Sequence, residues 1–114
     1  MDPILKYVPR EAIFRLADQV GIQPGQVVSQ TPAQNGAVGL TLFAFDKDTE
    51  ISTHQSDGDA LVTILEGTGQ LTIAGTAYVL RAGESILMPA KTPHAVYAPE
   101  PFKMALLVVF PGGG

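Results

Sequence analysis

The two histidines of the chain, His54 and His94, are its most versatile side chains for chemistry. An imidazole titrates near neutral pH, and it serves as an acid–base group, a hydrogen-bond partner or a metal ligand. The 114 residues include no cysteine, which excludes disulfides, thiolate nucleophiles and zinc–cysteine sites. The sequence also has no Ser–His–Asp signature, phosphate loop or dinucleotide fingerprint. Any site chemistry therefore depends on whether the fold brings the two imidazoles together.

The elements that must position these histidines are short apolar segments separated by glycine, proline and Asn-Gly or Asp-Gly turns. An amphipathic helix is predicted over residues 9–20, because Ile13, Leu16, Ala17 and Val20 recur at helical spacing before Gly21. Residues 26–31 read as an edge strand that Pro32 stops. The strands predicted after it are 38–45, 51–56, 60–66, 70–74, 77–80, 85–88, 94–98 and 103–110. This order predicts an all-β, antiparallel sandwich or barrel with a short N-terminal helix.

The alternation of side chains along the strands predicts which residues share a face. His94, Val96 and Ala98 share one face of their strand, and Ala60, Val62, Ile64 and Glu66 share one face of another. Leu61, Thr63 and Leu65 then point outward, and this apolar outer face predicts a homodimer. If His54 points inward, alternation takes Ser52 and Ser56 inward with it, and such a polar inner face suits a wet pocket.

Composition limits the classes of function. The sequence is 46% hydrophobic and 16% charged, which indicates one compact domain. A net charge of −4, with lysine and arginine scattered, argues against nucleic acid as a partner. No apolar run approaches the length of a membrane span, so no membrane partner is expected. The first residues show no secretory signal, which favours a cytoplasmic protein.

The segments around the two histidines resemble the motifs of the cupin superfamily. Leu65-Glu66-Gly67 with Gly69, Gly83-Glu84, Met88-Pro89 and Pro93-His94 all fit the family pattern. In the second motif Lys91 stands at a glycine position and Ala98 at the asparagine position. In the first motif, which is degenerate, Asp48 stands at the leading glycine position. The chain is thus similar to a small, single-domain, RmlC-like cupin of the cupin-2 kind.

The resemblance implies a double-stranded β-helix, or jelly-roll, barrel. It divides the single domain into an N-terminal helix and edge strand (1–36), a cupin barrel (37–110) and a flexible tail (111–114). Cupins typically hold a divalent metal (zinc, nickel, iron or manganese) with three histidines and a glutamate. Here His54 and His94 match two of these positions, while Ser56 and Ala60 occupy the other two. Two imidazoles with water make a weak divalent site, since tight sites have three or four protein ligands.

Two functions of different classes follow from these residues. The first is a binding protein that holds a small organic ligand in a pocket lined by His54, Ser56, Met88 and His94, with weak or absent metal. The second is a metal-dependent or acid–base cupin enzyme of the isomerase, cyclase or oxygenase type, in which His54 and His94 are the candidate catalytic residues. Fold does not choose between them. The sequence leaves open whether the protein is an enzyme.

Overall fold

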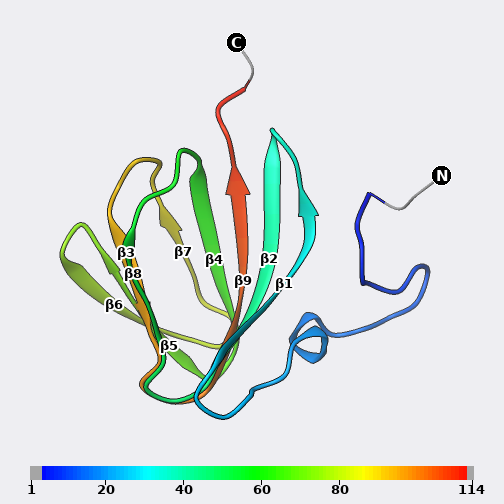
Figure 1. Cartoon of the computed structure of the whole chain (residues 1–114), viewed down its shortest axis with the longest axis horizontal. Coiled ribbons are helices and arrows are strands. Elements are labelled where there is room, and N and C mark those ends of the chain that lie inside the picture. The colour runs from blue at the N-terminus through cyan, green and yellow to red at the C-terminus, as the bar shows by residue number, and fades with distance from the viewer. Residues whose placement is uncertain (1–3, 113–114) are drawn as a thin grey trace.

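The structure is a computed structural model that describes residues 4–112, in which nine strands form two antiparallel sheets packed face to face (Figure 1). One sheet has the strand order β1-β2-β9-β4-β7 and the other β3-β8-β5-β6. The strands are β1 (Val27–Gln34), β2 (Val38–Phe45), β3 (Glu50–His54), β4 (Asp59–Glu66), β5 (Thr68–Ile73), β6 (Thr76–Arg81), β7 (Ser85–Met88), β8 (His94–Tyr97) and β9 (Phe102–Val109). The prediction of an all-β, antiparallel fold is confirmed.

The edge strand differs from its prediction in length. Strand β1 lies at the edge of the five-stranded sheet, as expected, but it continues through Pro32. Its register against β2 shifts between Gln30 and Ala33. Proline has no amide hydrogen, and a β-bulge is one of the few places where a strand tolerates it. Pro32, which was predicted to end the strand, therefore lies at a bulge within it.

The helix predicted over residues 9–20 is reduced to one 3-10 turn, η1 (Leu16–Gln19). Tyr7 and Glu11 have positive φ angles, and Arg15 is extended with no capping side-chain bond, so no helix can run through this segment. Of the expected apolar stripe only Ala17 and Val20 are buried, whereas Ile13 is fully exposed. A short helix needs tertiary packing to be stable, and the first half of this segment has none.

The main core lies between the two sheets. The alternation predicted for β4 is confirmed for Ala60, Val62 and Ile64, which are at most 1% exposed. It is wrong for Glu66, because a register shift after Ile64 pairs Glu66 with Lys103 and leaves its side chain exposed. The rings of Phe45 and Phe102 face each other across β2 and β9 and stack with centroids 4.6 Å apart. The residues of this core are Phe45, Ala60, Val62, Ile64, Leu71, Ile73, Leu80, Met88, Val96, Ala98, Phe102 and Met104. This core joins the two sheets into one unit, and the segments that carry His54 and His94 are part of that unit.

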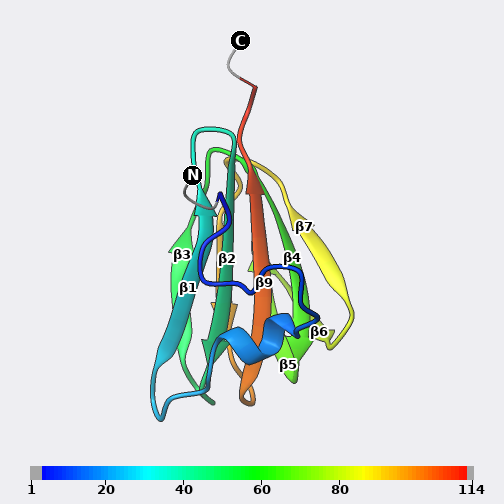
Figure 2. The same cartoon turned by 90° about the vertical axis from the view of Figure 1, so that its right-hand side faces the viewer.

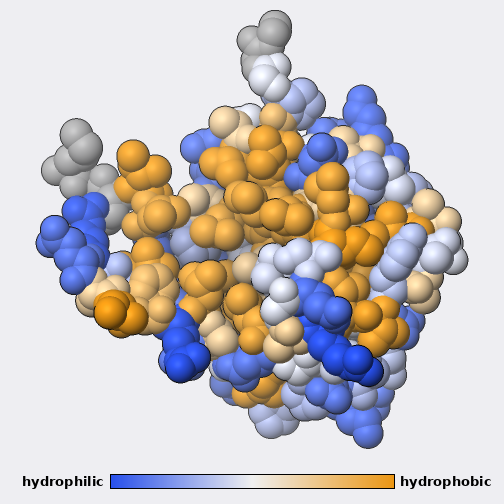
Figure 3. Space-filling view, turned by 180° about the vertical axis from the view of Figure 1, so that it is seen from behind, coloured by the Kyte–Doolittle hydropathy of each residue, from blue (hydrophilic) through white to orange (hydrophobic). Residues whose placement is uncertain are grey.

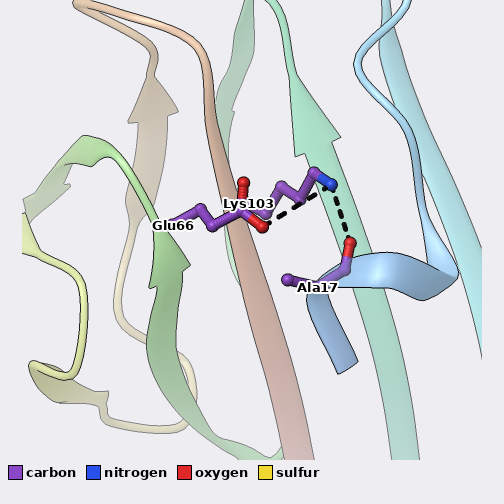
Figure 4. A network of polar contacts seen from close by, with 3 residues as sticks. All are labelled: Ala17, Glu66 and Lys103. Atoms are coloured by element: carbon purple, nitrogen blue, oxygen red, sulfur yellow. Dashed lines mark hydrogen bonds and ion pairs between the residues drawn. The ribbon is translucent and has the colours of Figure 1, made fainter. Parts of the chain in front are cut away.

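A smaller core lies on the outer face of the five-stranded sheet. Turn η1 crosses this face near one end of the strands (Figure 2), and Val20 packs there with Leu42 and Ala44. The amine of Lys103 fixes the turn, since it donates a hydrogen bond to the carbonyl of Ala17 over 2.7 Å (Figure 4). The outer face is therefore covered at one end only.

Two further predictions concern the chain ends and membranes. Pro111 and Gly112 are exposed and belong to no strand, while the rest of the predicted tail lies outside the described residues. The flexibility of residues 111–114 stays a prediction. Between residues 4 and 112, no helix has the length and apolar character needed to cross a membrane.

Candidate functional site

The structure brings His54 and His94 into direct contact. His54 ends β3 and His94 begins β8, and the two residues are partners across these neighbouring strands. Their rings meet edge to face, with centroids 4.3 Å apart and planes at 75°. The Nε2 atoms are 3.1 Å apart, within hydrogen-bond distance. The expectation that the two imidazoles share one place in the fold is confirmed.

A β-bulge aims His54 at its partner. Ile51 pairs with Val96 and His54 pairs with His94, so three residue steps on β3 oppose two on β8. Residues directly opposite across a ladder point to the same face, and His54 therefore joins the core-facing side of Ile51. Simple alternation had grouped Ser52 with His54. This grouping is wrong, because the bulge absorbs the extra residue and leaves the side chain of Ser52 exposed.

The backbone fixes the tautomer of both imidazoles. Nδ1 of His54 lies 2.9 Å from the carbonyl oxygen of Ser52, and Nδ1 of His94 lies 3.1 Å from that of Thr92. A carbonyl oxygen only accepts, so each Nδ1 carries a hydrogen and donates it. Both Nε2 atoms would then present lone pairs to each other at 3.1 Å unless one proton lies between them. A hydrogen bond between the two Nε2 atoms therefore requires one proton in addition to those on Nδ1.

The two imidazoles differ in their access to solvent. His94 is 4% exposed and is the one polar or charged side chain in the buried part of the described chain, whereas His54 is exposed. Burial lowers the pKa of His94, and the positive charge of His54 lowers it further, while the hydrogen bond to Thr92 acts in the opposite direction. The fold therefore opposes protonation of His94.

The other predicted pocket residues lie close in sequence to the pair but have partners of their own. The hydroxyl oxygen of Ser56 accepts a hydrogen bond from the amide of Gly58 over 3.1 Å, which fixes the turn before β4. Met88 is 2% exposed and faces Ala60 across β7 and β4, in the main core. A pocket-lining role for Ser56 and Met88 stays a prediction.

A metal site of the family kind does not fit these residues. Two nitrogens 3.1 Å apart match two corners of the coordination sphere of a zinc-like ion, whose bonds to imidazole nitrogen are about 2.0–2.1 Å long. The remaining positions have no donor, because Ala60 supplies none and the hydroxyl of Ser56 is engaged in the turn. Throughout residues 4–112, no three histidine, cysteine, aspartate or glutamate side chains converge on a common point.

Two positions that depart from the family motifs keep a backbone typical of glycine. Asp48 and Lys91, which stand where the motifs have glycine, have φ angles of +65° and +60°. The amide of Asp48 donates to the carbonyl of Ala98, and the amide of Lys91 donates to the carbonyl of Ser56. These bonds hold together the turns that flank the two histidine segments. Both turns therefore have the left-handed geometry that glycine adopts most readily, although neither residue is glycine.

Sequence reasoning missed a hollow of about 230 Å³. It lies where the turn before β4 meets the end of β9, and its lining includes neither histidine. Asp59, one of its two carboxylates, already accepts a hydrogen bond from the amide of Ala90 over 2.8 Å. The lining residues are Asp57, Gly58, Asp59, Ala90, Val109, Phe110 and Pro111. No sequence signal pointed to it, because it joins three segments that are distant along the chain.

Comparison with known proteins agrees with this fold. A family model described as a cupin domain matches residues 41–110. The chain therefore belongs to the cupin family, in which two antiparallel sheets form a double-stranded β-helix. Among proteins with curated descriptions, none is similar enough to count as a match.

Similar solved structures belong to the same class of protein. A conserved protein of unknown function from Streptococcus pyogenes is 39% identical over 98% of both chains, with a TM-score of 0.94. A cupin superfamily protein from Desulfitobacterium hafniense is 29% identical over 94% of this chain and 98% of its own, with a TM-score of 0.90. A cupin 2 conserved barrel domain protein from Leptotrichia buccalis is 38% identical over 84% of this chain but 47% of its own, with a TM-score of 0.83. The chain is a small, cupin-2-like domain.

Proposed function

We propose that this cupin binds a small organic molecule at the His54–His94 pair, through the imidazoles and without a tightly held metal. The supporting observation is the 3.1 Å contact between the two Nε2 atoms, one on a buried ring and one on an exposed ring. Both Nδ1 atoms are engaged with carbonyl groups, so Nε2 is the atom left for a ligand. When the ligand binds, one of its polar groups replaces one imidazole as the hydrogen-bond partner of the other imidazole.

The ligand chemistry follows from the surroundings of the pair. His94 is followed on its strand face by Val96 and Ala98, which are buried and apolar. Sites of this kind combine an apolar wall with few polar groups that fix orientation. The proposed ligand is therefore small and largely apolar, with one acidic or hydrogen-bonding group.

A screen by histidine-selective NMR tests this proposal. The probes are small carboxylic acids and phenols, added one at a time to uniformly labelled protein. We expect a binding probe to shift the imidazole signals of both histidines in the wild type and to lose affinity in His94→Ala. Binding that leaves both imidazole signals unchanged, or that survives the substitution, contradicts the proposal.

The same pair supports acid–base catalysis as a second candidate function. A proton held between two Nε2 atoms is available for transfer to or from a bound ligand, with the exposed His54 as the group in contact with it. Turnover of a binding probe, lost in His54→Gln with binding retained, would show that the protein is an enzyme. Binding of the probe without turnover favours the binding protein.

A further inference from the structure

The β1–β2 hairpin presents polar side chains to the space between the two sheets, where the neighbouring strands β9 and β4 present apolar ones. Thr41 on β2 pairs with Leu106 on β9, and Leu106 pairs with Val62, which is fully buried in the main core. Residues that pair across a ladder point to the same face, so Thr41 also points between the sheets. The hydroxyl oxygens of Thr41 and Thr31 lie 3.1 Å apart, which places Thr31 on this face as well.

A β-bulge aims Thr31 at Thr41. The register between β1 and β2 shifts between Gln30 and Ala33, so three residue steps on β1 oppose two on β2. Strand β3 has its own bulge directly before His54. Bulges re-aim side chains and are common beside functional sites. Strands β1 and β3 are edge strands of different sheets, and each therefore uses a bulge to turn a polar side chain into the space between the sheets.

Gln34 adds a carboxamide to the same face. It pairs with Gly39, whose other partner, Val108, packs against the main core. A Cβ atom at position 39 would lie 2.9 Å from Oε1 of Gln34, so the carboxamide occupies the room that a side chain at position 39 would take. The two threonines and this glutamine, Thr31, Gln34 and Thr41, are called the polar clamp below.

The polar clamp and the histidine pair lie at the same end of the sandwich, on facing sheets. Gly39, Val108 and Ala60 are successive cross-strand partners, and residues 55–58 alone separate His54 from the strand that carries Ala60. Strands β1 and β3 lie on opposite sides of the space between the sheets in Figure 1, and Figure 2 shows them at the same edge of the molecule. The polar clamp therefore faces the imidazoles across this space.

Solvent reaches the inner face at this end of the sandwich. Thr31 and His54 are exposed and Thr41 is half-buried, whereas Phe45 and Phe102, at the other end, are at most 1% exposed. The side of the molecule on which β6 and β7 lie, seen from behind in Figure 3, carries apolar surface over its middle instead. A ligand that enters from solvent beside β1 and β3 thus meets polar groups on both sheets.

We propose that the polar clamp binds the second end of the ligand held by the histidine pair, and that this ligand is a small hydroxy acid or oxo acid. The inference rests on the proposed binding at His54 and His94. The imidazoles take the acidic group, and the clamp takes a neutral hydroxyl or carbonyl group at the other end. Leu106 and Val108, which are half-buried beside the clamp, contact the apolar middle of the ligand.

The chemistry of the clamp selects a neutral group. Each threonine hydroxyl has one hydrogen and two lone pairs, so the contact between Thr31 and Thr41 uses one hydrogen and leaves the other free to donate. The carboxamide of Gln34 offers two donor hydrogens and an acceptor oxygen. The three side chains carry no charge, and an ionised group forms its strongest hydrogen bonds with a partner of opposite charge. A hydroxyl or carbonyl group therefore suits the clamp better than a second acid does.

Paired probes of graded length test the inference. The probes are straight-chain acids of three to six carbons with a terminal hydroxyl group, each compared with the unsubstituted acid of the same length. Dissociation constants come from the NMR signals of the imidazoles and of the threonine methyl groups. At one chain length we expect the hydroxy acid to bind about three- to tenfold more tightly than its partner, the effect of one or two neutral hydrogen bonds. An optimum length is expected because the fold fixes the distance from the imidazoles to the clamp.

Three variants locate the contact with the hydroxyl group. Thr41→Val keeps the branched shape without the hydroxyl, and it should lower the affinity for the hydroxy acid to that for the unsubstituted acid. Gly39→Ala should reduce the same advantage, because its Cβ atom displaces the carboxamide of Gln34. Thr72→Val is the matched control, since Thr72 is a half-buried strand threonine next to the core-facing Leu71 and so lies on the outer face of the other sheet. It should leave the advantage unchanged.

Each outcome supports or overturns the inference. Hydroxy acids that bind no more tightly than their partners at any length overturn the polar clamp, while binding of the unsubstituted acids at the imidazoles leaves the proposed function standing. An advantage that survives Thr41→Val, or that Thr72→Val also removes, overturns the clamp as well. Equal loss of affinity for both members of a pair in Thr41→Val would show that this threonine supports the fold and does not recognise a hydroxyl group. Probes that bind nowhere overturn both proposals.

Discussion

The Nε2 atoms of His54 and His94 lie 3.1 Å apart, although 40 positions separate the two residues in the sequence. The contact depends on one bulge in β3, and the carbonyls of Ser52 and Thr92 turn the other nitrogen of each ring away. Burial and the charge of His54 lower the pKa of His94, so the fold opposes protonation of this ring. This property links the site to the stability of the fold.

Stability should fall as the pH is lowered through the range in which unfolded histidine becomes protonated. The pKa of His94 lies below its ordinary value of 6.5 because of burial and the charge of His54. The unfolded chain therefore binds more protons below about pH 6.5. The free energy of unfolding should accordingly decline from about pH 6.5 down to the folded pKa, with no further contribution from this group above or below that window.

Urea unfolding of the wild type and of His94→Gln at pH 7.5, 6.5, 5.5 and 5.0 measures this decline. The decline should be smaller in His94→Gln. His54→Gln serves as the control, since it removes the neighbouring charge but leaves the burial of His94, and its decline should be intermediate. Identical pH dependence in the wild type and His94→Gln would show that other groups carry the effect.

Replacing Lys91 by glycine should stabilise the protein. Lys91 has a φ angle of +60° and an exposed side chain, and its amide bond to Ser56 is retained by glycine. Relief of the left-handed strain is worth on the order of 1 kcal/mol. Lys47→Gly is the control, because Lys47 is an exposed turn residue without positive φ, and it should be neutral or destabilising. Thermal unfolding of both variants measures the difference, and a lower midpoint for Lys91→Gly contradicts the prediction.

Replacing Gly69 by alanine should destabilise the main core. A Cβ atom at this position would lie 2.6 Å from the ring of Phe102, which is 1% exposed and stacked on Phe45. The ring has no space to move into, so the expected loss is about 1–3 kcal/mol in the free energy of unfolding. Gly36→Ala should change stability by less than about 0.5 kcal/mol, since nothing lies near its Cβ position. Equal losses in the two variants would argue against a steric cause.

Replacing Lys103 by methionine should release η1 from the sheet. The amine of Lys103 donates to the carbonyl of Ala17 and lies 3.8 Å from a carboxylate oxygen of Glu66, and its side chain is 13% exposed (Figure 4). Loss of this charged hydrogen bond should cost about 1.5–3 kcal/mol. Glu66→Gln should cost at most about 1 kcal/mol, because the ion pair is long and Glu66 is half exposed.

Hydrogen exchange and urea unfolding distinguish the two contacts of Lys103. Faster exchange around Ala17 is expected in Lys103→Met and not in Glu66→Gln. If Glu66→Gln is the more damaging variant, the ion pair rather than the carbonyl bond holds the turn.

Much of this fold could be predicted from the local sequence, because strands and turns leave local signals. Alternating apolar residues and glycine or Asn-Gly turns determined the strands, and alternation correctly assigned Ala60 and Val62 to the core and Leu61 to the surface. The helix predicted from the spacing of Ile13 and Leu16 was wrong. Spacing alone does not stabilise a helix when no surface of the chain covers its apolar face.

The sequence predicted which residues belong to the site but not how they are arranged. The sequence by itself determined that the only two imidazoles stand at two of the family's ligand positions and that Ala60 stands at a third. Tertiary structure decided that Ser52 and Thr53 fall in a bulge, that His54 points at His94, and which nitrogen of each ring carries the hydrogen. The reason is that a bulge is a property of the register between two strands. That register is set by the packing of β3 against β8, whose residues are far apart along the chain.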